Sequence, residues 1–331
     1  MSKLQKTDIQ TKYLDLINQA IKKSFGSAEW FPMESLTRGL SASTLYKIQI
    51  DSDYYVVRID NPEHPHNDLD REYHAMKMAA QHQIAPKVYY ADPKNGIVIM
   101  KFIESKPLES TDLIKPNYIK KFAQLVHGLH NGADFKKDIS IFERVDTIYK
   151  IMNPELKKSS VITECIEITN KLEQLLSDKE DIKPCHCDIN PYNLLFDGNK
   201  FWLVDWNAAS QQNFYFDLAS CATFFYFYNT NVCDEFLKEY FSRDLTAIEK
   251  NRFNFMKIFV AIYYGMMFIY QSGLRNFPLL SNKEIESLPN YTEFMRLIGQ
   301  GKERLDNPHT QQKFGFVFLK LALSESSSLV L

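Results

Sequence analysis

The hydrophobic pattern changes its period near residue 105, and this change limits the possible folds more than any other feature. Before it, short runs such as 45–50 and 54–59 alternate in period two around the turn 51–53, as β-strands of a hairpin do. Beyond it, apolar residues recur at i, i+3, i+4 and i+7, as in 119–129, which indicates a buried helix face. The sequence therefore predicts a β-rich N-terminal part followed by a mostly helical part.

Composition excludes several classes of protein. A content of 45% hydrophobic and 24% charged residues is typical of a globular chain and not of a disordered one. A net charge of −2 provides no bulk attraction to nucleic acid. The five cysteines form an odd set without a Cys-x-x-Cys pair, which favours reduced thiols over disulfides or zinc. The longest apolar run, 258–270, is shorter than the ~20 residues of a membrane span. With no apolar signal segment at the N-terminus, we expect a cytoplasmic protein without membrane insertion.

Polar residues surround a second predicted hairpin, whose turn is Asp197-Gly198. Asp188 and Asn193 precede its first strand, and Asp205 follows its second, so antiparallel pairing returns Asp205 to the neighbourhood of Asn193. Amide and carboxylate oxygens suit Mg²⁺, and a further carboxylate can accept a proton from a hydroxyl. Single Asp and Asn residues usually cap helices or fill turns, but this combination is the layout of phosphoryl transfer.

The segment 186–193, His-Cys-Asp-Ile-Asn-Pro-Tyr-Asn, with Asp205 twelve residues later, resembles the motif of a known superfamily. It is similar to the phosphotransferase motif of choline/ethanolamine kinases, including their LicA-type bacterial relatives, and of aminoglycoside phosphotransferases, which are relatives of protein kinases. Further segments resemble the family in its own order: 38–43 its nucleotide loop, 56–59 its third strand, 71–73 a helix start, 86–89 and 100–103 the run into the hinge, 125–130 a Leu-His helix end and 216–219 its Asp-Leu-Ala.

The resemblance implies a protein-kinase-like α+β fold of two lobes. A small antiparallel nucleotide-binding lobe would comprise residues 1–104, and a larger helical lobe that binds the acceptor would comprise 105–331. It also implies an ATP-dependent kinase that uses Mg²⁺ to transfer the γ-phosphoryl group to the hydroxyl of a small amino-alcohol, with choline as the first candidate.

Residue roles follow from the same resemblance. Asp188 would be the catalytic base, Asn193 and Asp205 would hold Mg²⁺, and Arg58 would contact phosphates while pairing with Glu72. The remaining nucleotide contacts would come from Ser41 and Ser43 in the phosphate loop and from the backbone of Met100 and Phe102 at the hinge.

Aromatic residues are abundant after residue 213, where the acceptor would bind. Tyr215, Tyr263 and Tyr264 could form a cation–π cage, although aromatic stripes on helices are more often core. Residues 251–282 contain no Asp or Glu, which suits a diffuse cation better than a polycationic aminoglycoside. Choline kinases often have Glu two residues after the metal Asp, whereas this chain has Asn207.

Several alternatives remain open at this point. Ethanolamine, thiamine and aminoglycosides are other acceptors, and a nucleotide-binding pseudokinase is the alternative to an enzyme. The sequence leaves open the choice of ATP over GTP, the oligomeric state and the role of residues 285–331.

Overall fold

The computed structural model describes residues 5–6, 9–26, 29–36, 43–64, 68–109, 111–132, 134–226, 229–274 and 278–328. The chain forms two compact units, Met1–Lys137 with Lys183–Gln211 and Asp138–Ile182 with Gln212–Leu331. The predicted lobe boundary between residues 104 and 105 follows the change from strands to helices. Compactness instead groups the helix α3 (Pro116–His130) and residues 183–211 with the N-terminal sheet.

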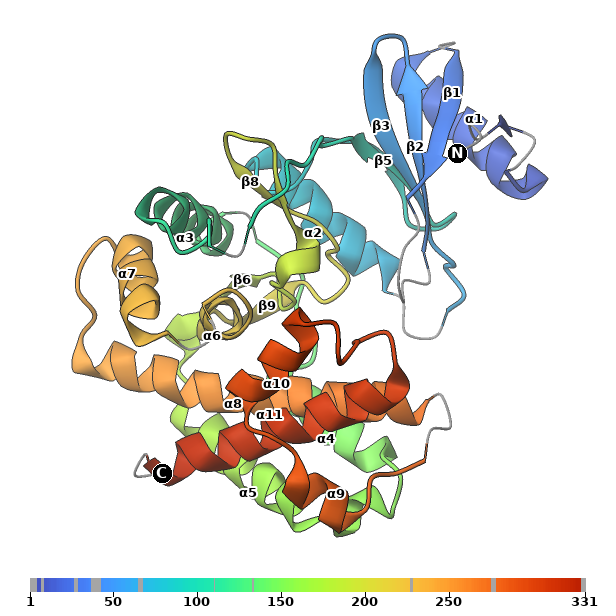
Figure 1. Cartoon of the computed structure of the whole chain (residues 1–331). Coiled ribbons are helices and arrows are strands. Elements are labelled where there is room, and N and C mark those ends of the chain that lie inside the picture. The colour runs from blue at the N-terminus through green and yellow to red at the C-terminus, as the bar shows by residue number, and fades with distance from the viewer. Residues whose placement is uncertain are drawn as a thin grey trace. The chain divides into compact units, whose positions relative to one another are not determined.

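The first unit contains a five-stranded antiparallel sheet (Figure 1). Its order is β1 (Trp30–Ser35), β2 (Thr44–Ile50), β3 (Asp53–Ile59), β5 (Ile97–Lys101) and β4 (Val88–Asp92). Helix α1 (Thr11–Phe25) packs on it, and Ile17, Ile48 and Val57 share one buried apolar cluster. The period-two pattern correctly predicted β2 and β3. It missed β1, because Pro32 interrupts the run, and proline is tolerated there since β1 is an edge strand.

Helix α2 (Leu69–Gln81) lies between β3 and β4 in the chain, and it contains near its beginning residues 71–73, for which the resemblance implied a helix start. Asp68 caps it, because its carboxylate accepts a hydrogen bond of 3.0 Å from the Arg71 amide. The cap sets the start of the helix at Leu69, so Arg71 and Glu72 fall in its first turn. Both side chains are buried although both are charged, which requires partners elsewhere in the unit.

The predicted Asp-Gly hairpin is also present in the first unit. Strands β7 (Leu194–Phe196) and β8 (Phe201–Leu203) pair antiparallel, with Leu194 opposite Leu203. Gly198 has φ +98°, which a side chain at this turn position would strain. The one-turn 3₁₀ helix η4 (Pro191–Asn193) leads into β7, and β6 (Ile182–Cys185) pairs with β9 (Ser210–Asn213).

The second unit is mostly helical in its described residues. Its α-helices are α4 (Ile141–Ile151), α5 (Ser160–Leu175), α6 (Tyr215–Phe224), α7 (Thr230–Phe241), α8 (Ala247–Gly273), α9 (Asn282–Ser287), α10 (Tyr291–Gly299) and α11 (Pro308–Ser328), with the short 3₁₀ turns η2 (Leu156–Lys158) and η3 (Lys179–Asp181). Helices α8 and α11 cross closely at two glycines (Figure 1). A Cβ atom on Gly315 would lie 2.7 Å from the Gly265 carbonyl oxygen, so the backbones can approach this far only without side chains there.

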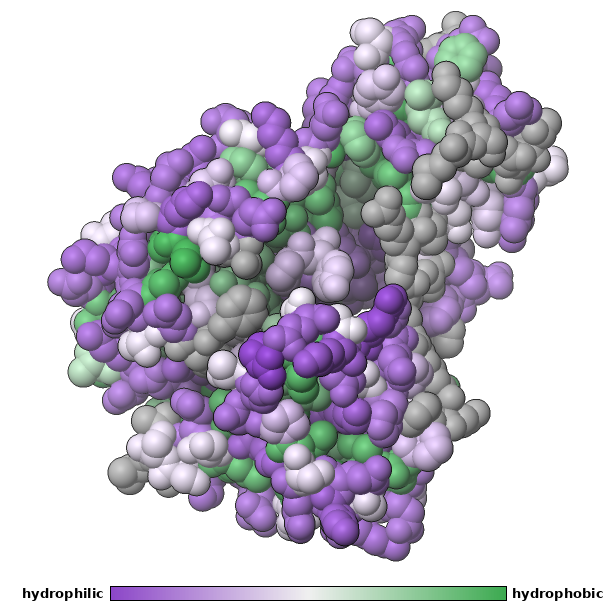
Figure 2. All heavy atoms as spheres, in the orientation of Figure 1, coloured by the Kyte–Doolittle hydropathy of each residue, from purple (hydrophilic) through white to green (hydrophobic). Residues whose placement is uncertain are grey.

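Helix α8 is longer than the 13-residue apolar run in the sequence, because polar residues at both ends continue the helix. Among the described residues it is the one helix long and apolar enough to cross a membrane. However, 67% of its apolar window is buried inside the protein, as in the core helix of a globular unit. In the space-filling view, hydrophilic residues dominate the visible surface over α10 and the loop that follows it (Figure 2). The predicted change from an antiparallel sheet to a helical region is confirmed.

Candidate functional site

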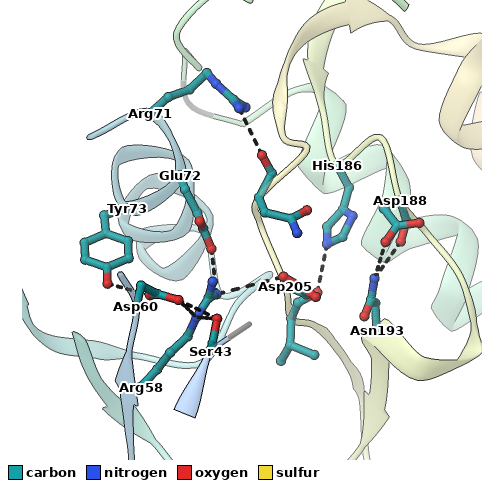
Figure 3. Close-up of polar contacts among 12 residues, drawn as sticks. Ser43, Arg58, Asp60, Arg71, Glu72, Tyr73, His186, Asp188, Asn193 and Asp205 are labelled. Carbon is teal, nitrogen blue, oxygen red and sulfur yellow. Dashed lines mark hydrogen bonds and ion pairs between the residues drawn. The ribbon is translucent and has the colours of Figure 1, made fainter. Parts of the chain in front are cut away.

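Arg58, on β3, lies within a cluster of three carboxylates in the first unit (Figure 3). Its Nη1 atom is 2.6 Å from Glu72 Oε1 and 3.9 Å from Asp205 Oδ1, and its Nε donates to Asp60 Oδ1 at 3.0 Å. Arg58 is only 8% exposed and Glu72 only 3%. The structure therefore brings together the two residues for which the sequence predicted an ion pair, and adds two acidic neighbours.

Three carboxylates around one guanidinium leave an excess of negative charge. Burial raises the pKa of Glu72 to about 7, with a contribution from Asp60 and Asp205 and against the opposing effect of Arg58. Burial would lower the pKa of Arg58, but Glu72, Asp60 and Asp205 together raise it. Such a cluster is stabilised when a further cation joins it, and the half-exposed Asp205 carboxylate is the member that solvent reaches.

Asp60 is the member of this cluster that the sequence analysis missed. It is 5% exposed, and its Oδ1 accepts hydrogen bonds from the Ser43 hydroxyl and from Arg58. Its Oδ2 accepts a hydrogen bond of 2.6 Å from the Tyr73 hydroxyl. A signal was available, because residues 58 and 60 share one face in the period of an extended strand. Ser43 is therefore placed at this cluster, whereas the other predicted loop residue, Ser41, lies outside the described residues.

Asp188 lies in the loop before β7, where two asparagine side chains hold its carboxylate. Figure 3 shows one of them, Asn193. Asn193 Nδ2 donates to Asp188 Oδ2 and to its carbonyl oxygen, both at 2.9 Å. Asn190 Nδ2 donates to Asp188 Oδ1 at 3.0 Å, and the Asn190 side chain accepts from the Tyr192 amide at the start of η4. Each carboxylate oxygen thus accepts from a neutral amide, and these two hydrogen bonds orient Asp188.

The hairpin brings Asp205 beside Asn193, as the sequence predicted. The Val204 amide donates to the Asn193 carbonyl at 3.0 Å, one residue before Asp205. His186 Nε2 donates to the Val204 carbonyl at 3.0 Å, and its ring lies 4.7 Å from the ring of Trp206. His186 thereby braces the strand end from which Asp205 projects.

Two residues of this region have a left-handed backbone although neither is glycine. Cys187, before Asp188, has φ +63°, and Asp205 has φ +66°. Such conformations cost on the order of 1 kcal/mol each, and they persist where surrounding contacts impose them, often at functional sites. Cys187 directly precedes Asp188, and Asp205 is itself one of the strained residues. The backbone strain therefore lies at the two acidic positions of the motif.

The donor set of Asn193 and Asp205 fits Mg²⁺. Asn193 commits its Nδ2 to Asp188, and no described residue donates to its Oδ1, which stays available as a ligand. An amide oxygen and a carboxylate, one of them solvent-accessible, match a metal that prefers oxygen ligands and retains several waters. The excess negative charge around Arg58 adds an electrostatic reason for a cation here.

Arg71 connects α2 to the chain that follows Asp205. Its Nη1 donates to the Ala209 carbonyl at 2.6 Å and its Nη2 to the Asn207 carbonyl at 3.0 Å. Arg71 and Glu72 are neighbours in the sequence, so one turn of α2 contacts both Arg58 and the Asp205 loop. The sequence indicates Arg71 only as part of a helix start, because the partners of its side chain lie 136 and 138 positions away.

The two predicted hinge residues lie at the end of β5. Met100 pairs with Val56 and Val88 inside the sheet and is 9% exposed. The Phe102 amide already donates to the Tyr54 carbonyl at 3.1 Å, so it is not free to bind a base. The Phe102 ring lies 4.1 Å from the Lys47 ammonium. Adenine contacts from these two residues remain a prediction.

The three tyrosines predicted at the acceptor pocket belong to the helical second unit. Tyr215, Tyr263 and Tyr264 are 1%, 6% and 7% exposed. The Tyr263 ring lies 5.0 Å from that of Phe216, and burial raises the pKa of Tyr215. This packing is that of core aromatics, and a role in cation binding remains a prediction.

Comparisons with known proteins find a matching family model and similar solved structures. A model of the phosphotransferase enzyme family matches residues 33–253. Protein LicA of Haemophilus influenzae is 23% identical over 162 residues, which are 46% of this chain and 59% of that protein. The choline kinase LicA of Streptococcus pneumoniae has a similar structure, with a TM-score of 0.68, 15% identity and coverage of 96% of this chain and 100% of that one. A spectinomycin phosphotransferase in complex with ADP and spectinomycin gives a TM-score of 0.59 at 13% identity, over 94% of this chain and 98% of that one.

Proposed function

Because the chain belongs to the phosphotransferase enzyme family, we propose that it is an ATP-dependent kinase for the hydroxyl of a small amino-alcohol. One observation carries the proposal, namely the convergence of Asp188, Asn193, Asp205 and Arg58 within the first unit. Phosphoryl transfer needs positioning and neutralisation of charge more than covalent chemistry. A buried cation, two oxygen ligands and an oriented carboxylate provide these.

In the proposed reaction, the acceptor hydroxyl lies against the Asp188 carboxylate. Asp188 accepts its proton as the oxygen attacks the γ-phosphorus, and the bond from phosphorus to the β-phosphate oxygen breaks to release ADP. Arg58 donates to the phosphate oxygens. Asn193 and Asp205 would hold Mg²⁺, which neutralises phosphate charge when bound.

We propose choline as the acceptor, for two reasons. The structurally similar LicA of Streptococcus pneumoniae is a choline kinase, and residues 251–282 lack acidic groups that a polycation would need. Because a spectinomycin phosphotransferase also has a similar structure, an antibiotic is the second candidate acceptor. Ethanolamine and thiamine are further candidates. The alignment covers only 59% of the Haemophilus relative, so its substrate is not carried over directly. With a net charge of −2 and a buried apolar helix α8, we expect a cytoplasmic enzyme without nucleic-acid or membrane partners.

The test is ADP release by the purified chain with Mg²⁺, ATP and each acceptor in turn. We expect turnover with choline above that with ethanolamine, thiamine, spectinomycin or kanamycin. Turnover with an antibiotic alone would make the antibiotic, and not choline, the acceptor. The absence of turnover with every one of these acceptors would refute the proposal that the chain is a kinase. Thermal stabilisation by MgATP without turnover would indicate the pseudokinase alternative.

Asp188→Asn tests the proposed base. Loss of a general base typically lowers the rate by about 10²–10⁴-fold, so we expect kcat to fall by at least about 100-fold. The KM for ATP should change little, because Asp188 is assigned to the hydroxyl and not to the nucleotide. Asp112→Asn is the matched control, since Asp112 pairs with Lys115 at the surface. Retention of wild-type kcat in Asp188→Asn would exclude the base role.

A further inference from the structure

We propose that Asp60 is a positioning residue that orients Arg58 toward the nucleotide phosphates and makes arginine, rather than lysine, necessary at position 58. The inference rests on the proposed function, because it concerns how the same site holds ATP.

Arg58 uses its nitrogen atoms separately. Nε donates to Asp60 and Nη1 pairs with Glu72, whereas Nη2 makes no hydrogen bond with the described residues. A guanidinium is planar, so two carboxylates bound at different nitrogens set both its position and its plane. The contacts of these two nitrogens then fix the direction in which the third nitrogen, Nη2, points. Nη2 is therefore the donor left for a phosphate oxygen.

Asp60 can act as such a guide because its own carboxylate is held from several sides. The Tyr73 hydroxyl donates to Oδ2 at 2.6 Å, and the Ser43 hydroxyl donates to Oδ1 (Figure 3). The Asp60 amide donates to the Gly96 carbonyl at 2.7 Å. Gly96 has φ +64°, and a Cβ there would lie 2.2 Å from the Asp60 carbonyl oxygen. Glycine at this turn thus allows the backbone of Asp60 to lie against the chain that leads into β5.

A lysine at position 58 could not satisfy this environment. Its ammonium is a single point of charge without the fixed fork of arginine. Drawn between Asp60 and Glu72, it would be held away from the phosphates, and if it paired with Glu72 alone, Asp60 would remain buried without a cation. Asp60 and Arg58 therefore form a matched pair, which predicts that the effects of changing them are not additive.

The experiment is a double-mutant cycle of Arg58→Lys, Asp60→Asn and the double variant. For Asp60→Asn we expect the KM for ATP to rise about tenfold, a change of about 1.4 kcal/mol, with the KM for the acceptor unchanged. Arg58→Lys should lose at least about 100-fold in kcat/KM for ATP. The double variant should recover at least about threefold over Arg58→Lys, because a neutral amide at position 60 no longer competes with the phosphates for the ammonium.

Tyr73→Phe keeps the proposal testable if Asp60→Asn does not fold. It removes only the hydroxyl that holds Asp60, so a several-fold rise in the KM for ATP is expected. Tyr46→Phe is its control, since Tyr46 is also a buried tyrosine in the sheet core. An unchanged KM for ATP in Asp60→Asn or, where that variant does not fold, in Tyr73→Phe, or additive effects in the cycle, would overturn the inference.

Calorimetric titration with MgADP separates this inference from the proposed function. If the wild type binds MgADP but phosphorylates no acceptor, the kinase proposal fails, while the Asp60 variants still report on nucleotide affinity. We expect about tenfold weaker MgADP binding in Asp60→Asn. A wild type that phosphorylates its acceptor, with equal MgADP affinity in Asp60→Asn, would refute the inference alone. A wild type that binds no MgADP would refute both.

Discussion

At the scale of single residues, Glu72 has an unusual environment for a carboxyl group. It is a carboxyl buried beside Arg58, with two further carboxylates nearby, and its pKa is raised from 4.5 to about 7. Between these pH values the folded chain binds a proton there that the unfolded chain has lost. The stabilisation from this group is therefore complete below about pH 4.5 and is lost as the pH rises through about 7.

Glu72→Gln should remove this pH dependence. Across about pH 4.5–7.5, the free energy of unfolding of the wild type should fall relative to that of the variant by on the order of 3 kcal/mol. Urea unfolding of the metal-free protein at several pH values measures this free energy. Only its slope against pH is compared between the two proteins, because the variant also loses an ion pair. The exposed Glu109→Gln variant should retain the wild-type slope. Parallel curves for the wild type and Glu72→Gln would contradict the raised pKa.

At the scale of elements, helix α2 connects two parts of the site that are far apart in the sequence. Glu72 contacts Arg58 on β3, and the adjacent Arg71 bonds the carbonyls of Asn207 and Ala209, just after Asp205. Two charge-assisted hydrogen bonds from a buried arginine hold that loop to the helix. The helix thus carries both the partner of the cation and the support of the proposed metal ligand.

Arg71→Gln should weaken metal use more than acceptor use. Without the two hydrogen bonds, the loop after Asp205 loses its support, so we expect the Mg²⁺ concentration for half-maximal activity to rise about 10-fold or more. The rate is measured against free Mg²⁺ at saturating ATP, together with the KM for the acceptor. Lys77→Gln, an exposed change on the same helix, is the control. An unaltered Mg²⁺ requirement in Arg71→Gln would show that the loop does not depend on this contact.

At the scale of the whole molecule, ligand binding should appear as added stability. A ligand that binds only the folded chain stabilises it by about 3 kcal/mol at roughly a hundredfold excess over its Kd, which corresponds to several degrees in Tm. We expect MgADP to raise the Tm of the wild type, and EDTA to reduce that rise. If Asp205 holds the metal, Asp205→Asn should lose most of the Mg²⁺-dependent part. An equal Mg²⁺-dependent rise in both proteins would exclude Asp205 as a ligand.

Local patterns were enough to predict much of this protein. The strands β2 and β3, helix α3 and the Asp-Gly hairpin follow from periodicity and turn chemistry, because each depends on neighbours in the chain. Local patterns also predicted that Asn193 and Asp205 lie close together, since a short hairpin closes the distance between them. Edge strand β1 was missed because its proline obscures the pattern.

The sequence by itself determined the element types and the hairpin-borne acidic residues, since these depend on interactions over a few positions. Only the tertiary structure decided that Asp60, Tyr73 and Arg71 join the site and that Tyr263 and Tyr264 pack among other rings. The physical reason is that burying a charged or hydroxyl group requires a partner, and the partner can lie anywhere in the chain. Periodicity in the sequence identifies a buried position, but only tertiary packing brings the hydrogen-bond or ion-pair partner that a buried polar group needs.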